Sequence, residues 1–110
     1  MAIIKLEKLQ CVKTEDRRRD QTYIEVKNHG QVTRVFGPRA MQAGDEVLLE
    51  GLSYEMNDLV LYVWDEDHGQ GALYNPDDRL GFHRPSLEPG TRIADFTEDG
   101  AEYHLTYTVS

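Results

Sequence analysis

The stretch that decides the fold runs from Leu59 to His83 and reads LVLYVWDEDHGQGALYNPDDRLGFH. Its first residues, Leu59 to Trp64, are hydrophobic on both alternating faces, which predicts a central buried strand over residues 59–65. Asp65 and Asp67 close this run. Because a strand alternates its side chains with period two, both carboxylates leave on one side, with Cα atoms roughly 6.5 Å apart. Carboxylates this close repel one another unless positive charge lies between them.

A second acidic pair, Asp77 and Asp78, follows a loop of small and turn-forming residues and leads into a short predicted strand over residues 79–83. Carboxylate oxygens suit a hard divalent cation, and Ca²⁺ tolerates a flexible loop better than Mg²⁺ does. An EF-hand does not explain the pattern. Counted from Asp65, the positions that an EF-hand fills with Asp or Asn, Gly and Glu are occupied by Gly69, Gln70 and Pro76. The stretch therefore predicts a calcium site of another kind.

Short strand patterns separated by turn signals fill the rest of the chain, and no segment sustains a 3.6-residue period. Eight strands are predicted, over residues 2–13, 23–27, 32–36, 45–51, 59–65, 79–83, 92–96 and 102–109. The segment 52–58 gives no clear assignment. We therefore expect an all-β fold, an eight-stranded antiparallel β-sandwich, with residues 1–110 forming a single domain.

Two local patterns add detail to this expectation. In residues 2–13 the hydrophobic side chains change parity midway, which predicts a β-bulge near Glu7-Lys8; a helix is the alternative for this segment. Gly37-Pro38 is a strong turn signal. It is expected to end the third strand and to leave residues 39–44 as a connection.

The charge balance and the cysteine content exclude several classes of function. Twelve Lys and Arg stand against twenty Asp and Glu, for a net charge of −8. This argues against a nucleic-acid partner, because nucleic-acid binders contact phosphates through Lys and Arg. Cys11 is the only cysteine, so neither an internal disulfide nor a Cys-based zinc site can form. No apolar run matches a signal peptide or a membrane span. We expect a soluble cytoplasmic protein, with export by a route without a cleavable signal left open.

The order of these elements resembles a C2 domain, a β-sandwich of eight strands whose loops at one end bind calcium. Three motifs carry the resemblance: Asp20 ahead of Gln21-Thr22-Tyr23, Asp65-Glu66-Asp67 after Val63-Trp64, and Asp78 ahead of Arg79-Leu80-Gly81. The resemblance implies that calcium is held by the carboxylates of Asp20, Asp65, Asp67 and Asp78. It also implies a further ligand from the first loop, for which Asp16 and Glu15 are both candidates.

Arg17, Arg18 and Arg19 lie beside the expected site and open an alternative. Their guanidinium groups would pair with the acidic loops, giving a metal-independent sandwich that serves as a protein-interaction or structural module. Beside bound calcium they would instead favour an anionic lipid headgroup, and Leu73 and Tyr74 would either enter the membrane or fold back on the sandwich. A calcium ion is thus the first expected partner, and a protein or an anionic lipid headgroup the second.

Catalysis has little support in the sequence. No serine lies in a Gly-x-Ser-x-Gly motif, and Cys11 falls in a predicted strand, where a cysteine is usually a small buried side chain. The histidines show no metal-ligand spacing. A carboxylate pair of the glycosidase type needs a cleft that a sandwich of this size seldom builds. We therefore expect a binding module and not an enzyme.

Overall fold

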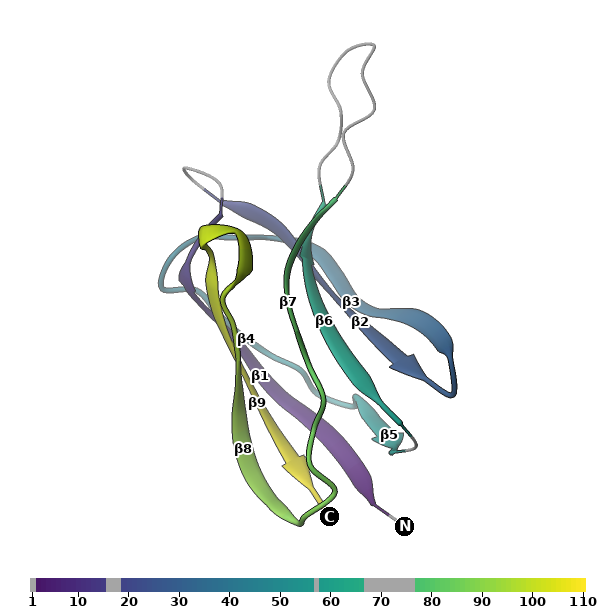
Figure 1. Ribbon diagram of the computed structural model, residues 1–110. Helices are drawn as coiled ribbons and strands as arrows, with labels where there is room; N and C mark the ends of the chain where they lie inside the picture. The colour runs from purple at the N-terminus through teal and green to yellow at the C-terminus, as the bar shows by residue number, and fades with distance from the viewer. Residues whose placement is uncertain (1, 16–18, 57, 67–76) are drawn as a thin grey trace.

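A computed structural model describes residues 2–15, 19–56, 58–66 and 77–110. Two antiparallel sheets face one another in these residues (Figure 1). One sheet has the order β4-β1-β9-β8, with β5 also paired to β1, and the other has the order β3-β2-β6-β7. The strands are β1 (Ile3–Lys13), β2 (Asp20–Asn28), β3 (Gln31–Met41), β4 (Glu46–Leu48), β5 (Ser53–Glu55), β6 (Val60–Asp65), β7 (Asp78–His83), β8 (Gly90–Phe96) and β9 (Glu102–Val109).

The expected all-β antiparallel sandwich is confirmed, but the described residues form nine strands and not eight. The additional strand is β5, which lies in the segment that the sequence left unassigned. β4 pairs with Lys8–Gln10 and β5 pairs with Ile3–Lys5, so two short strands cover one long edge of β1. β5 has no apolar run that would have predicted a strand. It forms by pairing with this edge of β1.

The parity change in β1 is a β-bulge, as predicted. The register with β9 shifts between Leu6 and Lys8. A bulge lets a strand turn its side chains over without leaving the sheet. As a result the hydrophobic residues on both sides of the bulge reach the core, and their exposed fraction is 0% for each of Ile4, Leu6, Leu9 and Cys11.

The expectation that Gly37-Pro38 ends the third strand is wrong. β3 continues through this dipeptide to Met41, and its last residues pair with Asp20–Thr22 at the start of β2. The register shifts on either side of Ile24, and Gly37 has a φ of 81°, so the chain bulges at this point and then resumes pairing. β3 is an edge strand, where a proline costs no interior ladder hydrogen bond.

The hydrophobic run of β6 lies between β2 and β7, and its two faces have different surroundings. Leu61 and Val63 point into the core between the sheets. On the other face, Trp64 and Tyr62 join a row of aromatic rings that begins at Tyr23 on β2 and ends at Phe82 on β7. In the described part of the chain, neighbouring aromatic rings therefore cover the outer face of β6. Among the described residues, no helix is long and apolar enough to cross a membrane.

We predict that Gly37→Ala destabilises the fold far more than Gly30→Ala, although both glycines have a positive φ, 81° and 76°. A Cβ on Gly37 would lie 2.3 Å from the backbone oxygen of Thr22, whereas a Cβ on Gly30 would meet nothing within 4 Å. Gly30→Ala should cost about 1 kcal/mol of unfolding free energy through backbone strain alone. Gly37→Ala should cost about 3 kcal/mol or more. Urea unfolding of the two variants measures this, and equal losses would contradict the steric argument.

Candidate metal centre

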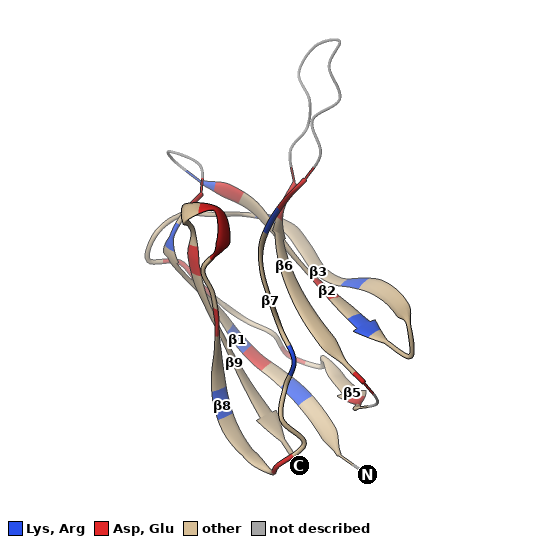
Figure 2. Cartoon of the chain, in the orientation of Figure 1, with Lys and Arg blue, Asp and Glu red and all other residues tan. Residues whose placement is uncertain are grey.

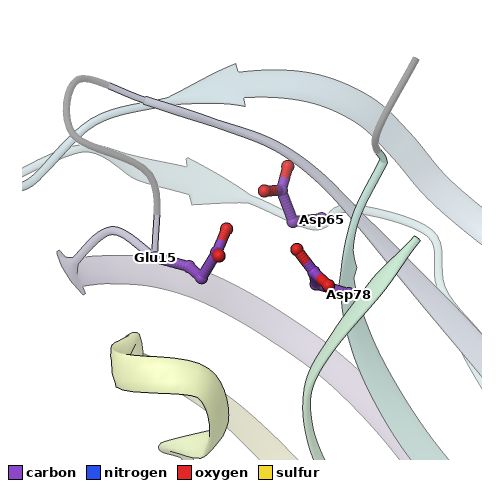
Figure 3. Close-up of side chains that lie close together, drawn as sticks. All are labelled: Glu15, Asp65 and Asp78. Carbon is purple, nitrogen blue, oxygen red and sulfur yellow. The ribbon is translucent and has the colours of Figure 1, made fainter. Parts of the chain in front are cut away.

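Three strand ends bring three carboxylates together at one end of the sandwich. Glu15 follows β1, Asp65 ends β6 and Asp78 begins β7. One carboxylate oxygen from each residue lies within 4.8 Å of the other two. Figure 3 shows the three side chains converging from separate segments of the chain. In Figure 2, further acidic segments gather at the same end of the molecule, on several strands and on the 3₁₀ turn Glu98–Gly100.

The register of β6 and β7 explains two members of this group, because Asp65 is the antiparallel partner of Asp78. Residues that face each other in this way have Cβ atoms about 5 Å apart, and like charges in such a pair are destabilising. Asp65 is 1% exposed, so its charge is removed from water as well. Its Oδ1 accepts a hydrogen bond of 2.8 Å from the backbone N–H of Gln21, which fixes the direction of the carboxylate.

Asp20 lies deeper than this group, with an exposed fraction of 0%. Its Oδ2 accepts a hydrogen bond from the Tyr103 hydroxyl at 2.7 Å and one from the backbone N–H of Glu15 at 3.1 Å. Burial raises the pKa of the Tyr103 phenol above its usual range, and the hydrogen bond to Asp20 raises it further. Tyr103 therefore keeps its proton and remains a donor to the carboxylate.

The residues that the sequence predicts as metal ligands have different surroundings in the structure. Asp65 and Asp78 lie together, and the first-loop candidate Glu15 lies with them. Asp20 is bound to Tyr103 and to the Glu15 backbone. Asp16 and Asp67 lie outside the described residues, as do Leu73 and Tyr74 of the following loop. The assignment of ligands to Asp16, Asp20 and Asp67 thus stays a prediction.

Two arginines at this end pair with acidic residues around the group. Arg79 Nε lies 2.8 Å from Glu98 Oε1, and Arg34 Nη1 lies 3.4 Å from Glu66 Oε2. Of the three arginines in the alternative hypothesis, Arg19 is exposed, and Arg17 and Arg18 lie outside the described residues. These surface pairs are each worth about 1 kcal/mol or less.

The donor set consists of carboxylate oxygens, which suit a hard cation. Ca²⁺ binds oxygens at about 2.3–2.6 Å, so two oxygens on one ion can lie up to about 5 Å apart, whereas Mg²⁺ needs about 4.2 Å or less. The Glu15, Asp65 and Asp78 oxygens lie within 4.8 Å of one another, which is inside the limit for Ca²⁺. Ca²⁺ takes six to eight oxygens. Backbone carbonyls, water or loop carboxylates would supply the remaining oxygens around the ion.

Comparison with solved structures tests the fold independently of the site. A structure described as that of a C2 domain matches 99% of this chain and 96% of its own, with a TM-score of 0.57 and 19% sequence identity. The chain has a C2-like fold. Human GIVD cytosolic phospholipase A2, solved with methyl γ-linolenyl fluorophosphonate, also matches 99% of the C2-like domain at a TM-score of 0.53 and 10% identity.

The match to the phospholipase covers 17% of that enzyme's chain, and at this identity it shows the fold alone. No protein-family model matches the C2-like domain, and no curated protein matches it by sequence. The comparisons therefore establish the architecture. The chemistry of the site has to be argued from its own side chains.

Two hydrogen-bond donors at this end of the sandwich could not be predicted from the sequence. The backbone N–H of Gln21 binds Asp65, and the hydroxyl of Tyr103 binds Asp20. The alternation of residues 102–109 does predict that Tyr103 shares a face with Leu105, Tyr107 and Val109. It does not reveal that the Tyr103 hydroxyl meets a carboxylate of the opposite sheet.

We predict that Asp78→Asn stabilises the C2-like domain in the presence of EDTA. The variant removes one of the two like charges that face each other across β6 and β7. The free energy of unfolding should rise by about 0.5–1 kcal/mol at low salt, and by less at high salt because ions screen the repulsion. Urea unfolding in the presence of EDTA at two salt concentrations measures the change.

Asp99→Asn is the matched control, since Asp99 is exposed at the same end and Asn tolerates its φ of 58°. A loss of stability in Asp78→Asn would show that an attractive contact holds this carboxylate instead.

Proposed function

We propose that this C2-like domain is a calcium-binding module whose ion is held at one end of the sandwich by Glu15, Asp65 and Asp78. The observation that carries the proposal is the approach of their three carboxylate oxygens to within 4.8 Å of one another. Residues from three separate strand ends supply these oxygens, so the group forms only when the sandwich is folded. Asp16 and Asp67 are further ligand candidates from the sequence.

The chain's own residues prepare the site in two ways. Gln21 N–H orients the Asp65 carboxylate, and the antiparallel register keeps Asp78 opposite it. The resulting repulsion favours any cation that enters, since an opposite charge stabilises both carboxylates at once. A bound Ca²⁺ would supply that charge. With exposed loops nearby, we expect a dissociation constant of about 10⁻⁵ to 10⁻³ M.

A binding role agrees better with the described residues than a catalytic one. Cys11, the only thiol, has an exposed fraction of 0%, and burial raises its pKa above the usual value. A buried protonated thiol is a poor nucleophile. Glu15, Asp65 and Asp78 converge on one another and would hold an ion between them, an arrangement different from the carboxylate pair on either side of a substrate that glycoside hydrolysis needs.

The metal-independent module remains the second candidate, because several acidic residues at this end have protein partners. Glu98 and Glu66 pair with arginines, and Asp77 Oδ2 accepts a hydrogen bond of 2.5 Å from the Tyr23 hydroxyl. If such pairing extends to the central group, added cations will have no effect on stability. The two candidates therefore differ in one measurable property.

We predict that Ca²⁺ raises the melting temperature of the chelated wild-type protein and that the double variant Asp65→Asn/Asp78→Asn abolishes the rise. At a ligand concentration about 100 times the dissociation constant, binding adds about 2.7 kcal/mol to the free energy of unfolding. Thermal melts in EDTA and in millimolar Ca²⁺, followed by calorimetric titration, measure the effect. Asp99→Asn removes one charge from the same end and should keep the full rise. An identical wild-type midpoint in EDTA and in Ca²⁺ would support the metal-independent module.

A further inference from the structure

The surroundings of Asp20 are those of a residue that holds the metal ligands in place and not of a ligand itself. Its carboxylate is fully buried, and one oxygen receives both the Tyr103 hydroxyl and the backbone N–H of Glu15. A buried carboxylate is costly without such donors, and hydrogen bonds to a charged acceptor are about twice as strong as neutral ones. Moving Asp20 toward an ion would break both of these hydrogen bonds.

The hydrogen bonds around Tyr103 have a defined direction. Tyr103 lies on β9 in one sheet, while Asp20 and Thr22 lie on β2 in the other. The Tyr103 hydroxyl has one proton, which it donates to Asp20. Its 2.8 Å contact with Thr22 Oγ1 must then be donated by Thr22. The chain of donors runs from Thr22 through Tyr103 to Asp20, and it ties the two sheets together directly beneath the acidic group.

The dipeptide Asp20-Gln21 contacts two members of that group at once. The Asp20 side chain holds the backbone of Glu15, and the Gln21 N–H holds the side chain of Asp65. The Gln21 carbonyl also accepts a 2.8 Å hydrogen bond from the Glu66 N–H, next to Asp65. The relative position of Glu15 and Asp65 therefore depends on where the start of β2 is fixed, and Tyr103 fixes it from the opposite sheet.

We propose that Asp20 and Tyr103 are positioning residues for the cation site: they hold the Glu15 backbone in place and thereby set the affinity for calcium, without touching the ion. This inference rests on the proposed calcium-binding function. It assigns to Asp20 a role different from that of the ligands Glu15, Asp65 and Asp78, and it gives Tyr103, which cannot ligate Ca²⁺ as a neutral buried phenol, a measurable influence on binding.

The test compares Tyr103→Phe, Asp20→Asn and a control, Tyr107→Phe. Tyr107 lies on the same strand and the same buried face as Tyr103, and its hydroxyl makes a 2.9 Å hydrogen bond to His83 Nε2. Each tyrosine variant thus removes one buried, hydrogen-bonded hydroxyl. Calcium dissociation constants are measured by calorimetry at a temperature where circular dichroism shows every variant folded. The proton chemical shift of the Glu15 amide is measured in EDTA.

We expect Tyr103→Phe and Asp20→Asn each to weaken calcium binding by about 10- to 100-fold, as residues that orient metal ligands do. Tyr107→Phe should leave the dissociation constant within about twofold. The double variant should be no weaker than the weaker single variant, because the two residues act through one hydrogen bond. The Glu15 amide proton should move upfield in Asp20→Asn, because a neutral amide oxygen is a weaker acceptor than a carboxylate. It should also shift in Tyr103→Phe, because Asp20 loses the other donor to the oxygen that binds Glu15 N–H.

Three results would overturn the inference, and they are distinguishable. If Asp20→Asn abolishes binding while Tyr103→Phe binds normally, Asp20 is itself a ligand. If both variants lower the melting temperature but leave the dissociation constant and the Glu15 amide shift unchanged, their role is only structural. If the wild-type protein gives no heat with Ca²⁺, the proposed function fails and this role in affinity fails with it.

Discussion

The antiparallel register of β6 and β7 places Asp65 opposite Asp78, and the acidic end of the sandwich depends on this one constraint. Like charges directly opposite each other in an antiparallel pair destabilise it by up to about 1 kcal/mol. A hydrogen bond to a charged group contributes about 1.5–3 kcal/mol. The Gln21 N–H bond to Asp65 is therefore of the size needed to hold the carboxylate in place, but it does not neutralise the pair. A cation at this point would act on both charges at once.

Glu15 joins this pair because of how the first strand ends. β1 belongs to one sheet and β2 to the other, and Glu15 follows two residues after the end of β1. Near that end, the Gly44 N–H donates to Cys11 O and the Cys11 N–H donates to Asp45 O, which holds this part of β1 in place. Asp65 and Asp78 both lie in the second sheet. The complete group of three therefore requires the two sheets to keep a fixed relation, which the Tyr103 hydroxyl supports at the same end.

Much of this arrangement follows from the sequence, and its gaps have physical causes. The two-sided apolar run before Asp65 predicts β6, and acidic residues at adjacent strand ends predict that Asp65 and Asp78 meet. β5 escaped prediction because three residues on the edge of an existing strand need no pattern of their own. The prediction that the third strand ends at Gly37-Pro38 was wrong because this dipeptide usually ends a strand, whereas an edge strand can bulge and continue. Asp20 has the right residue type and spacing for a ligand, but only the fold shows that its carboxylate faces Tyr103 and the Glu15 backbone.

The geometry also bears on which positive group balances these charges. A guanidinium is a planar fork that matches the two oxygens of one carboxylate, or one oxygen from each of two. A spherical ion accepts oxygens from many directions and has no preferred plane. The Arg79 and Glu98 pair, with contacts of 2.8 and 3.5 Å, shows the fork arrangement at the edge of this end. Glu15, Asp65 and Asp78 instead approach a common point from three chain segments (Figure 3). An ion without a preferred plane could take one oxygen from each of these segments, as the proposed calcium site requires.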